Sequence, residues 1–264
     1  MKLRRYGAAL MTLLLLLSIV LLSSCGNSKP DSTEPQTNSD APSSSSGSDG
    51  DADSTDDPDR EAGSPDGSYT PSREVRTEDD GNILVLVNKE YPVSEDYEPS
   101  DMVEIDGSLS TNQNLKVKRE AYEAYLEMLK DAQAEGLNFS ICSAYRSYAL
   151  QESLYNNSLA ANGKEYTETM FAYPGKSEHH TGYAIDITSA SMNWGLSQDF
   201  TEYPDGAWIT EHCSEYGFII RYPKGKEDVT GYVYEPWHIR YVGIDTAKYI
   251  TDHELTLEEY LGVA

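Results

Sequence analysis

The chain has 264 residues, and 45 Asp and Glu against 20 Lys and Arg give it a formal net charge of −25 at pH 7. Such an acidic surface repels the phosphate backbone of nucleic acids, so no nucleic-acid partner is expected; anionic lipid and wall polymer are repelled in the same way. The length suits one folded domain with a sizeable core, together with further segments.

The first residues predict an export signal. Basic residues precede an apolar run over residues 8–22, which is the layout of a signal peptide and is short for a membrane span of about 20 apolar residues. The run ends in Leu-Ser-Ser-Cys, which resembles the bacterial lipobox, so residues 1–24 are predicted to be a lipoprotein signal peptide and Cys25 the lipid-modified N-terminus. An ordinary secretory signal and a short anchor helix are the alternatives. All three place the folded domain outside the cytoplasm.

A polar segment follows the signal. Ser, Asp, Gly and Pro dominate it, and residues 30–68 contain no aliphatic side chain larger than Ala. Such a segment cannot bury enough apolar surface to offset the entropy of ordering, so residues 25–80 are predicted to be a disordered acidic linker. A flexible chain of this length spans roughly 40 Å. Residues 81–264 are then the single folded domain.

Within this domain, hydrophobic patterns typical of strands and helices follow one another in irregular order. Strands are expected at 83–89, 137–146, 182–188, 218–223 and within 231–242, and helices at 118–136, 147–161, 208–217 and near the C-terminus. The first helix is expected to bury one face formed by Tyr122, Tyr125, Leu126, Leu129 and Ala132. This order predicts an α+β fold with a mainly antiparallel sheet.

Two cysteines remain if Cys25 carries lipid. Cys142 and Cys213 lie in apolar surroundings, where free thiols are common, and neither has the CxxC spacing of a structural zinc site. Free thiols are favoured, and a disulfide is the alternative for an exported protein.

The histidines suggest a metal site. All of them follow position 178: His179, His180, His212, His238 and His253. A hydrolytic zinc site needs about three ligands from His, Asp or Glu and an open position for water. Two segments each contain more than one possible ligand: SEHHTGYAID at 177–186 and EPWHIRYVG at 235–243.

Within these segments, some residues are stronger candidates than others. Glu235 lies three residues before His238, so one turn of the chain could put a base carboxylate beside a metal-binding imidazole. Asp186 lies in an apolar strand, where a buried carboxylate is costly unless a metal or a cation neutralises it. The alternative for Asp186 is an ion pair with Arg or Lys. Arg146, at the strand-to-helix corner SAYRSY, is a further candidate, and the alternative for it is a structural ion pair with a carboxylate. His180 could be a surface residue, a donor behind the site or a substrate contact.

The segments also carry a family resemblance. The pattern S-x-H-x-x-G-x-A-x-D matches at 177–186 and E-x-W-H at 235–238, and both resemble the VanY-type D-alanyl-D-alanine carboxypeptidases. These are zinc peptidases of bacterial cell walls, related to the VanX dipeptidases and, by fold, to the Hedgehog signalling domain. The similarity runs in order over nearly all of residues 83–245, through SAYRSYALQESLY, YPGKSEHHTGYAIDI and WITEHCSEYGFIIRYP.

The resemblance implies a role for each matching residue. Zinc would be bound by His179, Asp186 and His238, and Glu235 would be the general base acting on the zinc-bound water. Arg146 would stabilise the oxyanion of the tetrahedral intermediate. Ser177 and Gln151 match positions expected to hydrogen-bond the substrate peptide.

The predicted function is removal of the C-terminal D-alanine from peptidoglycan stem peptides by a zinc D-alanyl-D-alanine carboxypeptidase. An L,D-carboxypeptidase acting on tetrapeptide stems is the first alternative, and a non-catalytic peptidoglycan-binding domain is the second. The protein is expected to be a monomeric lipoprotein, held to the membrane through Cys25 and facing the cell wall.

Overall fold

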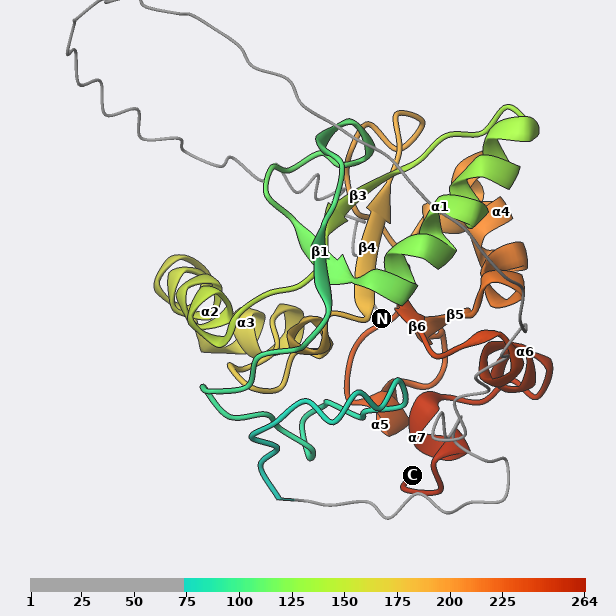
Figure 1. The fold of residues 1–264 in the computed structure, drawn as a ribbon. Coiled ribbons are helices and arrows are strands. Elements are labelled where there is room, and N and C mark those ends of the chain that lie inside the picture. Colours follow the sequence, from blue (N-terminus) through green and yellow to red (C-terminus); the bar gives the residue numbers. More distant parts are fainter. Residues whose placement is uncertain (1–73) are drawn as a thin grey trace, which may run out of the picture. The chain divides into compact units, whose positions relative to one another are not determined.

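The computed structural model describes residues 74–264 and shows helices packed around a small antiparallel sheet (Figure 1). The predicted α+β class is therefore confirmed. The predicted signal peptide, Cys25 and most of the predicted linker lie outside the described residues. In the part of the chain that is described, no helix combines the length and apolar character that a membrane crossing requires.

The central sheet has four antiparallel strands in the order β3-β4-β6-β5. Their bounds are Ser140–Ser143 for β3, Ala184–Thr188 for β4, Glu235–Tyr241 for β6 and Phe218–Tyr222 for β5. All five residues of β4 are buried, because the strand is internal and covered on both faces. The pairing of β4 with β6 sets Asp186 directly opposite His238.

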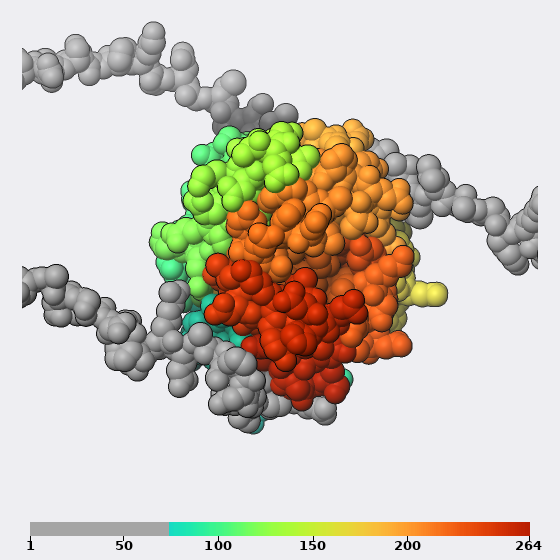
Figure 2. All heavy atoms as spheres, turned by 90° about the vertical axis from the view of Figure 1, so that its right-hand side faces the viewer, coloured from blue at the N-terminus to red at the C-terminus, as the bar shows by residue number. Residues whose placement is uncertain are grey.

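A second, two-stranded sheet joins β1 (Met102–Glu104) to β2 (Lys116–Lys118), and β2 leads directly into helix α1. The helices are α1 (Arg119–Ala134), α2 (Tyr148–Asn162), α3 (Lys164–Met170), α4 (Pro204–His212), α5 (Glu227–Thr230), α6 (Ile244–Asp252) and α7 (Leu257–Tyr260). Short 3-10 turns lie at η1 (Gly107–Leu109), η2 (Glu178–Thr181), η3 (Phe200–Glu202) and η4 (Cys213–Tyr216). On the face shown in Figure 2, residues of α1 (green), the α4 region (orange) and the C-terminal region (red) adjoin one another.

Helix α1 covers the core with a face slightly rotated from the predicted one. Tyr125, Leu129 and Ala132 are buried as expected, and Met128 joins them. Leu126, which was expected on this face, is 36% exposed. The buried residues of this face belong to the main hydrophobic core, whose packing a single amphipathic pattern does not specify.

The strand predicted at 83–89 is wrong. Leu84, Val85, Leu86 and Val87 are buried, but no named strand of the described chain includes them. The Arg240 side chain instead donates from Nη2 to the carbonyl oxygens of Ile83 and Val85, at 2.6 and 2.9 Å. A buried guanidinium thus satisfies backbone groups that a neighbouring strand would otherwise pair.

The helix predicted at 208–217 begins earlier and changes type. Helix α4 starts at Pro204, where the fixed φ of proline suits a first turn, and continues as the turn η4. Gly217 follows with φ 86°, so the predicted stop is confirmed.

The described fold also includes the last residues of the predicted linker. Arg76 forms a β-bridge with Val93, and the buried carboxylate of Asp79 accepts hydrogen bonds from Lys118 and Ser100. The ordered contacts therefore begin before Gly81.

The two cysteines in the described residues are free thiols. Cys213 is buried in the main core, whereas Cys142 is half-buried and donates to the carbonyl oxygen of Asp186. The preference for free thiols over a disulfide is confirmed.

Gly206, in the first turns of α4, gives a test of this packing. A Cβ at position 206 would overlap the carbonyl oxygen of Phe200. We expect Gly206→Ala to destabilise the fold by about 1–3 kcal/mol through overpacking, which lowers the thermal midpoint by about 2–4 °C per kcal/mol. Gly107→Ala is the matched control, because nothing lies within 4 Å of its added Cβ. Equal midpoints for the two variants in a thermal melt would contradict this account.

Candidate metal centre

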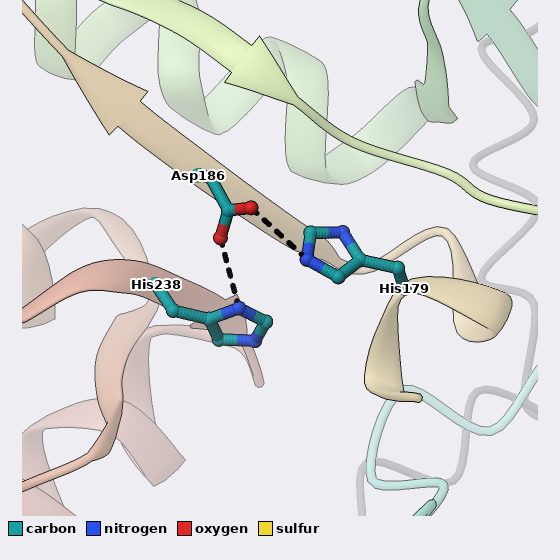
Figure 3. A group of neighbouring side chains, drawn as sticks. All are labelled: His179, Asp186 and His238. Atoms are coloured by element: carbon teal, nitrogen blue, oxygen red, sulfur yellow. Dashed lines mark hydrogen bonds and ion pairs between the residues drawn. The ribbon is translucent and has the colours of Figure 1, made fainter. Parts of the chain in front are cut away.

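Three predicted ligands converge in a buried cluster. His179 comes from the turn η2, Asp186 from β4 and His238 from β6 (Figure 3). Asp186 lies between the two imidazoles: its Oδ2 is 3.2 Å from Nε2 of His179 and its Oδ1 is 2.9 Å from Nδ1 of His238. The ligand atoms of the three residues all lie within 4.8 Å of one another.

A glycine turn brings His179 to the strand that carries Asp186. Gly182 ends η2 in the left-handed region, with φ 75°, and the chain then enters β4. A Cβ at position 182 would lie 2.8 Å from Sδ of Met102, so close packing adds to the conformational requirement for glycine. The glycine therefore lets His179 and Asp186 approach each other although they lie on different elements.

The donor set fits a transition metal such as zinc. Two imidazole nitrogens and a carboxylate oxygen are ligand types that zinc takes, and these atoms already lie within 4.8 Å of one another. The second nitrogen of each ring faces an oxygen acceptor: Nδ1 of His179 lies 2.7 Å from the carbonyl oxygen of Ala144, and Nε2 of His238 lies 3.0 Å from Glu178 Oε2. Such partners fix the ring of a ligating histidine and its tautomer.

The protonation behaviour of the cluster follows from burial and charge. Burial, together with the charge of Arg146, lowers the pKa of His179 to about 4, so the ring is neutral at pH 7. Burial would also lower the pKa of His238, but hydrogen bonds to Asp186 and Glu178 outweigh it and raise that pKa to about 9. Burial would raise the pKa of Asp186, yet the two histidines hold it well below its usual range. At pH 7 the protonated His238 is therefore the cationic partner of Asp186, and a bound metal cation would replace its Nδ1 proton.

Glu235 reaches the site from a strand, so the single turn expected for Glu235 and His238 is wrong. In a regular strand, residues three apart point to opposite faces. The β5–β6 register shifts here, because Ile220 pairs with Ile239 whereas Tyr222 pairs with Glu235, and the bulge breaks the alternation. Burial raises the pKa of Glu235 to about 7, and the charges of His238, Asp186 and Arg146 modify it. The carboxylate therefore lies within the electrostatic reach of the cluster.

Arg146 is held by its backbone and by its side chain. Its N–H donates to the carbonyl oxygen of His179 at 3.1 Å, and its Nη1 donates to Oε1 of Gln151 at 2.8 Å. Within residues 74–264, the buried Nε of Arg146 has no hydrogen-bond partner. Desolvation lowers the pKa of the guanidinium from its ordinary value, while the nearby Asp186 and Glu235 oppose this shift. A buried N–H donor that lacks a partner is suited to an anionic ligand.

His180 is buried, and both of its ring nitrogens form hydrogen bonds with backbone groups. Its Nδ1 lies 2.7 Å from the carbonyl oxygen of Arg146, and its Nε2 accepts from the backbone N–H of Gly175 at 3.1 Å. Because Nε2 accepts, Nδ1 is the nitrogen that carries the proton and donates to Arg146. Of the possibilities left open by the sequence, the structure favours a donor behind the site, and the surface position is wrong.

The other predicted residues take different places. Gln151 is fully buried, and its Nε2 donates to the carbonyl oxygen of Ala172 while its Oε1 accepts from Arg146; its contact with substrate stays a prediction. Ser177 is buried at the start of η2, and its substrate contact likewise stays a prediction. His212 bonds to Glu215 and His253 to its own helix, and neither belongs to the metal group found among the described residues.

Sequence reasoning missed Glu178, which is fully buried against His238. Arg221 and Arg240 lie beside it, both fully buried in strands. A signal was present, because an arginine inside each of the apolar strands FIIRYP and HIRYV requires a buried anionic partner.

Comparison with known proteins identifies the family. The family model for VanY, described as D-alanyl-D-alanine carboxypeptidase, matches residues 114–244. A putative carboxypeptidase, YodJ, of Bacillus subtilis (strain 168) is 46% identical over 182 residues, which are 68% of this chain and 67% of that protein. The chain belongs to the VanY family of D-alanyl-D-alanine carboxypeptidases. The prediction of a carboxypeptidase, and hence of a hydrolase, is confirmed at this level.

Two solved structures of peptidases share the fold. The LdcB LD-carboxypeptidase, whose structure is solved, is 44% identical in sequence to this chain, and the two structures match with a TM-score of 0.65. The match covers 69% of this chain and 86% of the LdcB chain. The vancomycin-resistance D,D-pentapeptidase VanY, solved in complex with Zn(II), is 30% identical in sequence to this chain, with a TM-score of 0.57. The match covers 67% of this chain and 98% of the VanY chain. The predicted similarity to the Hedgehog and DD-peptidase fold is therefore confirmed.

Substitutions of the two adjacent histidines test the cluster. We expect His179→Ala to lose tight zinc binding, because it removes a ligand, whereas His180→Ala keeps it, because that ring faces Arg146 and Gly175. His180→Gln is the matched control, since an amide can both donate and accept. Metal analysis after dialysis measures the bound zinc. Zinc retained by His179→Ala and lost from His180→Ala would overturn the assignment.

Proposed function

We propose that this protein is a zinc-dependent peptidoglycan carboxypeptidase that removes the C-terminal D-alanine of stem peptides. The observation that carries the proposal is the convergence of the His179, Asp186 and His238 cluster with Glu235 and Arg146. Zinc is supported by the donor set and by the VanY structure in complex with Zn(II).

Glu235 is proposed to move the proton. When bound, zinc supplies a Lewis acid that polarises a carbonyl and makes water nucleophilic near neutral pH. Glu235, with a pKa near 7, is matched to accept a proton from the attacking water and to deliver it to the leaving amine. Its half-buried position keeps the carboxylate next to the cluster while leaving it accessible to substrate.

Arg146 is proposed to stabilise the oxyanion that forms on the scissile carbonyl. Its guanidinium is already held by Gln151, and its backbone is held by His179 and His180. A charge fixed before the reaction does not have to reorganise as the oxyanion develops. The buried Nε without a partner in the described chain supplies a donor for this purpose.

Two scissile bonds are compatible with this site. The sequence prediction is the D-Ala-D-Ala bond of a pentapeptide stem, which agrees with the description of the family model. The second candidate is the L,D bond of a tetrapeptide stem, and it is favoured by the 44% identity to an LD-carboxypeptidase, against 30% to the D,D-pentapeptidase. Both bonds release D-alanine, and they differ in the residue that precedes it.

Mass spectrometry of defined muropeptides decides between the bonds. We expect zinc-loaded protein to release one D-alanine from a pentapeptide stem, whereas shortening of a tetrapeptide stem alone would establish the L,D alternative. Glu235→Gln is expected to lower kcat by about 10²- to 10⁴-fold while zinc is retained. Glu227→Gln, at an exposed carboxylate, is the control. Zinc-loaded protein that leaves both stems intact would refute the enzyme and favour a peptide-binding domain.

We also propose that Cys25 anchors the protein to the outer side of the membrane, with the acidic linker reaching toward the wall. The support is the signal layout of residues 1–24 and their Leu-Ser-Ser-Cys end. Cys25→Ser should move the expressed protein from the membrane fraction to the soluble fraction, and loss of radiolabelled fatty acid should accompany the change. A membrane-bound, unlabelled wild-type protein would instead indicate an anchor helix.

A further inference from the structure

Glu178 joins the metal cluster to a buried charge network. Its Oε2 lies 3.0 Å from Nε2 of His238, on the side of the ring opposite Asp186. Its Oε1 accepts from Nε of Arg221 at 2.6 Å and from Nη1 of Arg240 at 2.8 Å. The side chains of Glu178, Arg221 and Arg240 are all 0% exposed.

The network determines what Glu178 can offer to His238. A carboxylate beside two guanidinium groups remains an anion, and an anionic carboxylate only accepts hydrogen bonds. The ring nitrogen that faces Glu178 must therefore carry the proton. Nδ1 of His238 also faces a carboxylate, that of Asp186 at 2.9 Å, and therefore carries a proton as well when no metal is bound. A metal that replaces this proton would bind Nδ1, while Nε2 keeps its proton on Glu178.

We propose that Glu178 is a positioning residue for the metal: it holds His238 in the Nε2–H tautomer, so that Nδ1 is available as the ligand. The inference rests on the proposed metal site and deepens it. Arg221 and Arg240 stabilise the buried anion, and Arg240 also fixes the segment at Ile83 and Val85. The three residues 178–180 thus each serve a different part of the site, since His179 is a ligand and His180 holds Arg146.

Glu258 offers a matched control within the same network. It accepts from Nη1 and Nη2 of Arg221, at 2.9 and 2.6 Å, and from Asn88, and it is 3% exposed. No hydrogen bond or ion pair found in the described chain joins Glu258 to His238. Glu178→Gln and Glu258→Gln therefore each remove one buried carboxylate charge beside Arg221, but only Glu178→Gln changes the partner of His238.

The test is zinc affinity, measured on the purified protein by competition with a chromophoric chelator. We expect Glu178→Gln to weaken zinc binding about 10- to 100-fold, and Glu258→Gln to leave it within about threefold of wild type. Both variants should lower the thermal midpoint of the metal-free protein. Unchanged zinc affinity in Glu178→Gln, or equal weakening in the two variants, would overturn the proposal.

A second measurement uses the wild-type protein, so its result does not depend on whether a variant folds. Long-range ¹H–¹⁵N spectra of zinc-loaded wild-type protein should show His238 with its proton on Nε2, and a proton on Nδ1 would overturn the proposal. Wild-type protein that binds no zinc would refute the proposed metal site itself. Zinc binding with the wrong tautomer would refute only the role of Glu178.

Discussion

The antiparallel pairing of β4 with β6 is the constraint on which the rest of the site depends. It sets Asp186 opposite His238 on the two inner strands of the sheet, so that one carboxylate and one imidazole meet where neither can move far. The turn η2 then needs to deliver only one further ligand, His179, and the left-handed Gly182 allows it to do so immediately before β4. Burial makes the arrangement costly without a cation, and the cation is what the arrangement is suited to bind.

Around this pair, the fold places charges of alternating sign. Asp186 lies between the two histidines, Glu178 lies behind His238, and Arg221 and Arg240 lie behind Glu178. Each buried charge thus has an opposite charge or a hydrogen-bond donor beside it, which is the condition for its burial. Arg146 differs, because its Nε has no partner in residues 74–264 and is therefore available to an anionic group on a substrate.

The same interactions connect the site to the stability of the domain. Arg240 binds the backbone of the N-terminal segment at Ile83 and Val85, and Arg221 binds Glu258 in α7. Segments far apart in the chain thus meet through the arginines that also neutralise Glu178. Cutting such a network affects packing and metal binding together, and only paired substitutions such as those at Glu178 and Glu258 separate the two effects.

The sequence by itself determined the fold class, the strands that carry Asp186 and His238, and the choice of His179 over His180, because spacing and residue type are local properties. It placed a strand at 83–89, where the structure has a buried segment bonded to Arg240. It also predicted that a single turn brings Glu235 beside His238, whereas both residues lie in strand β6, whose pairing with β5 shifts register. The roles of Glu178, His180 and Gln151 were decided only by the tertiary structure. A hydrophobic pattern shows that a segment is buried, whereas the partner of a buried polar atom depends on contacts between residues that are far apart in the chain.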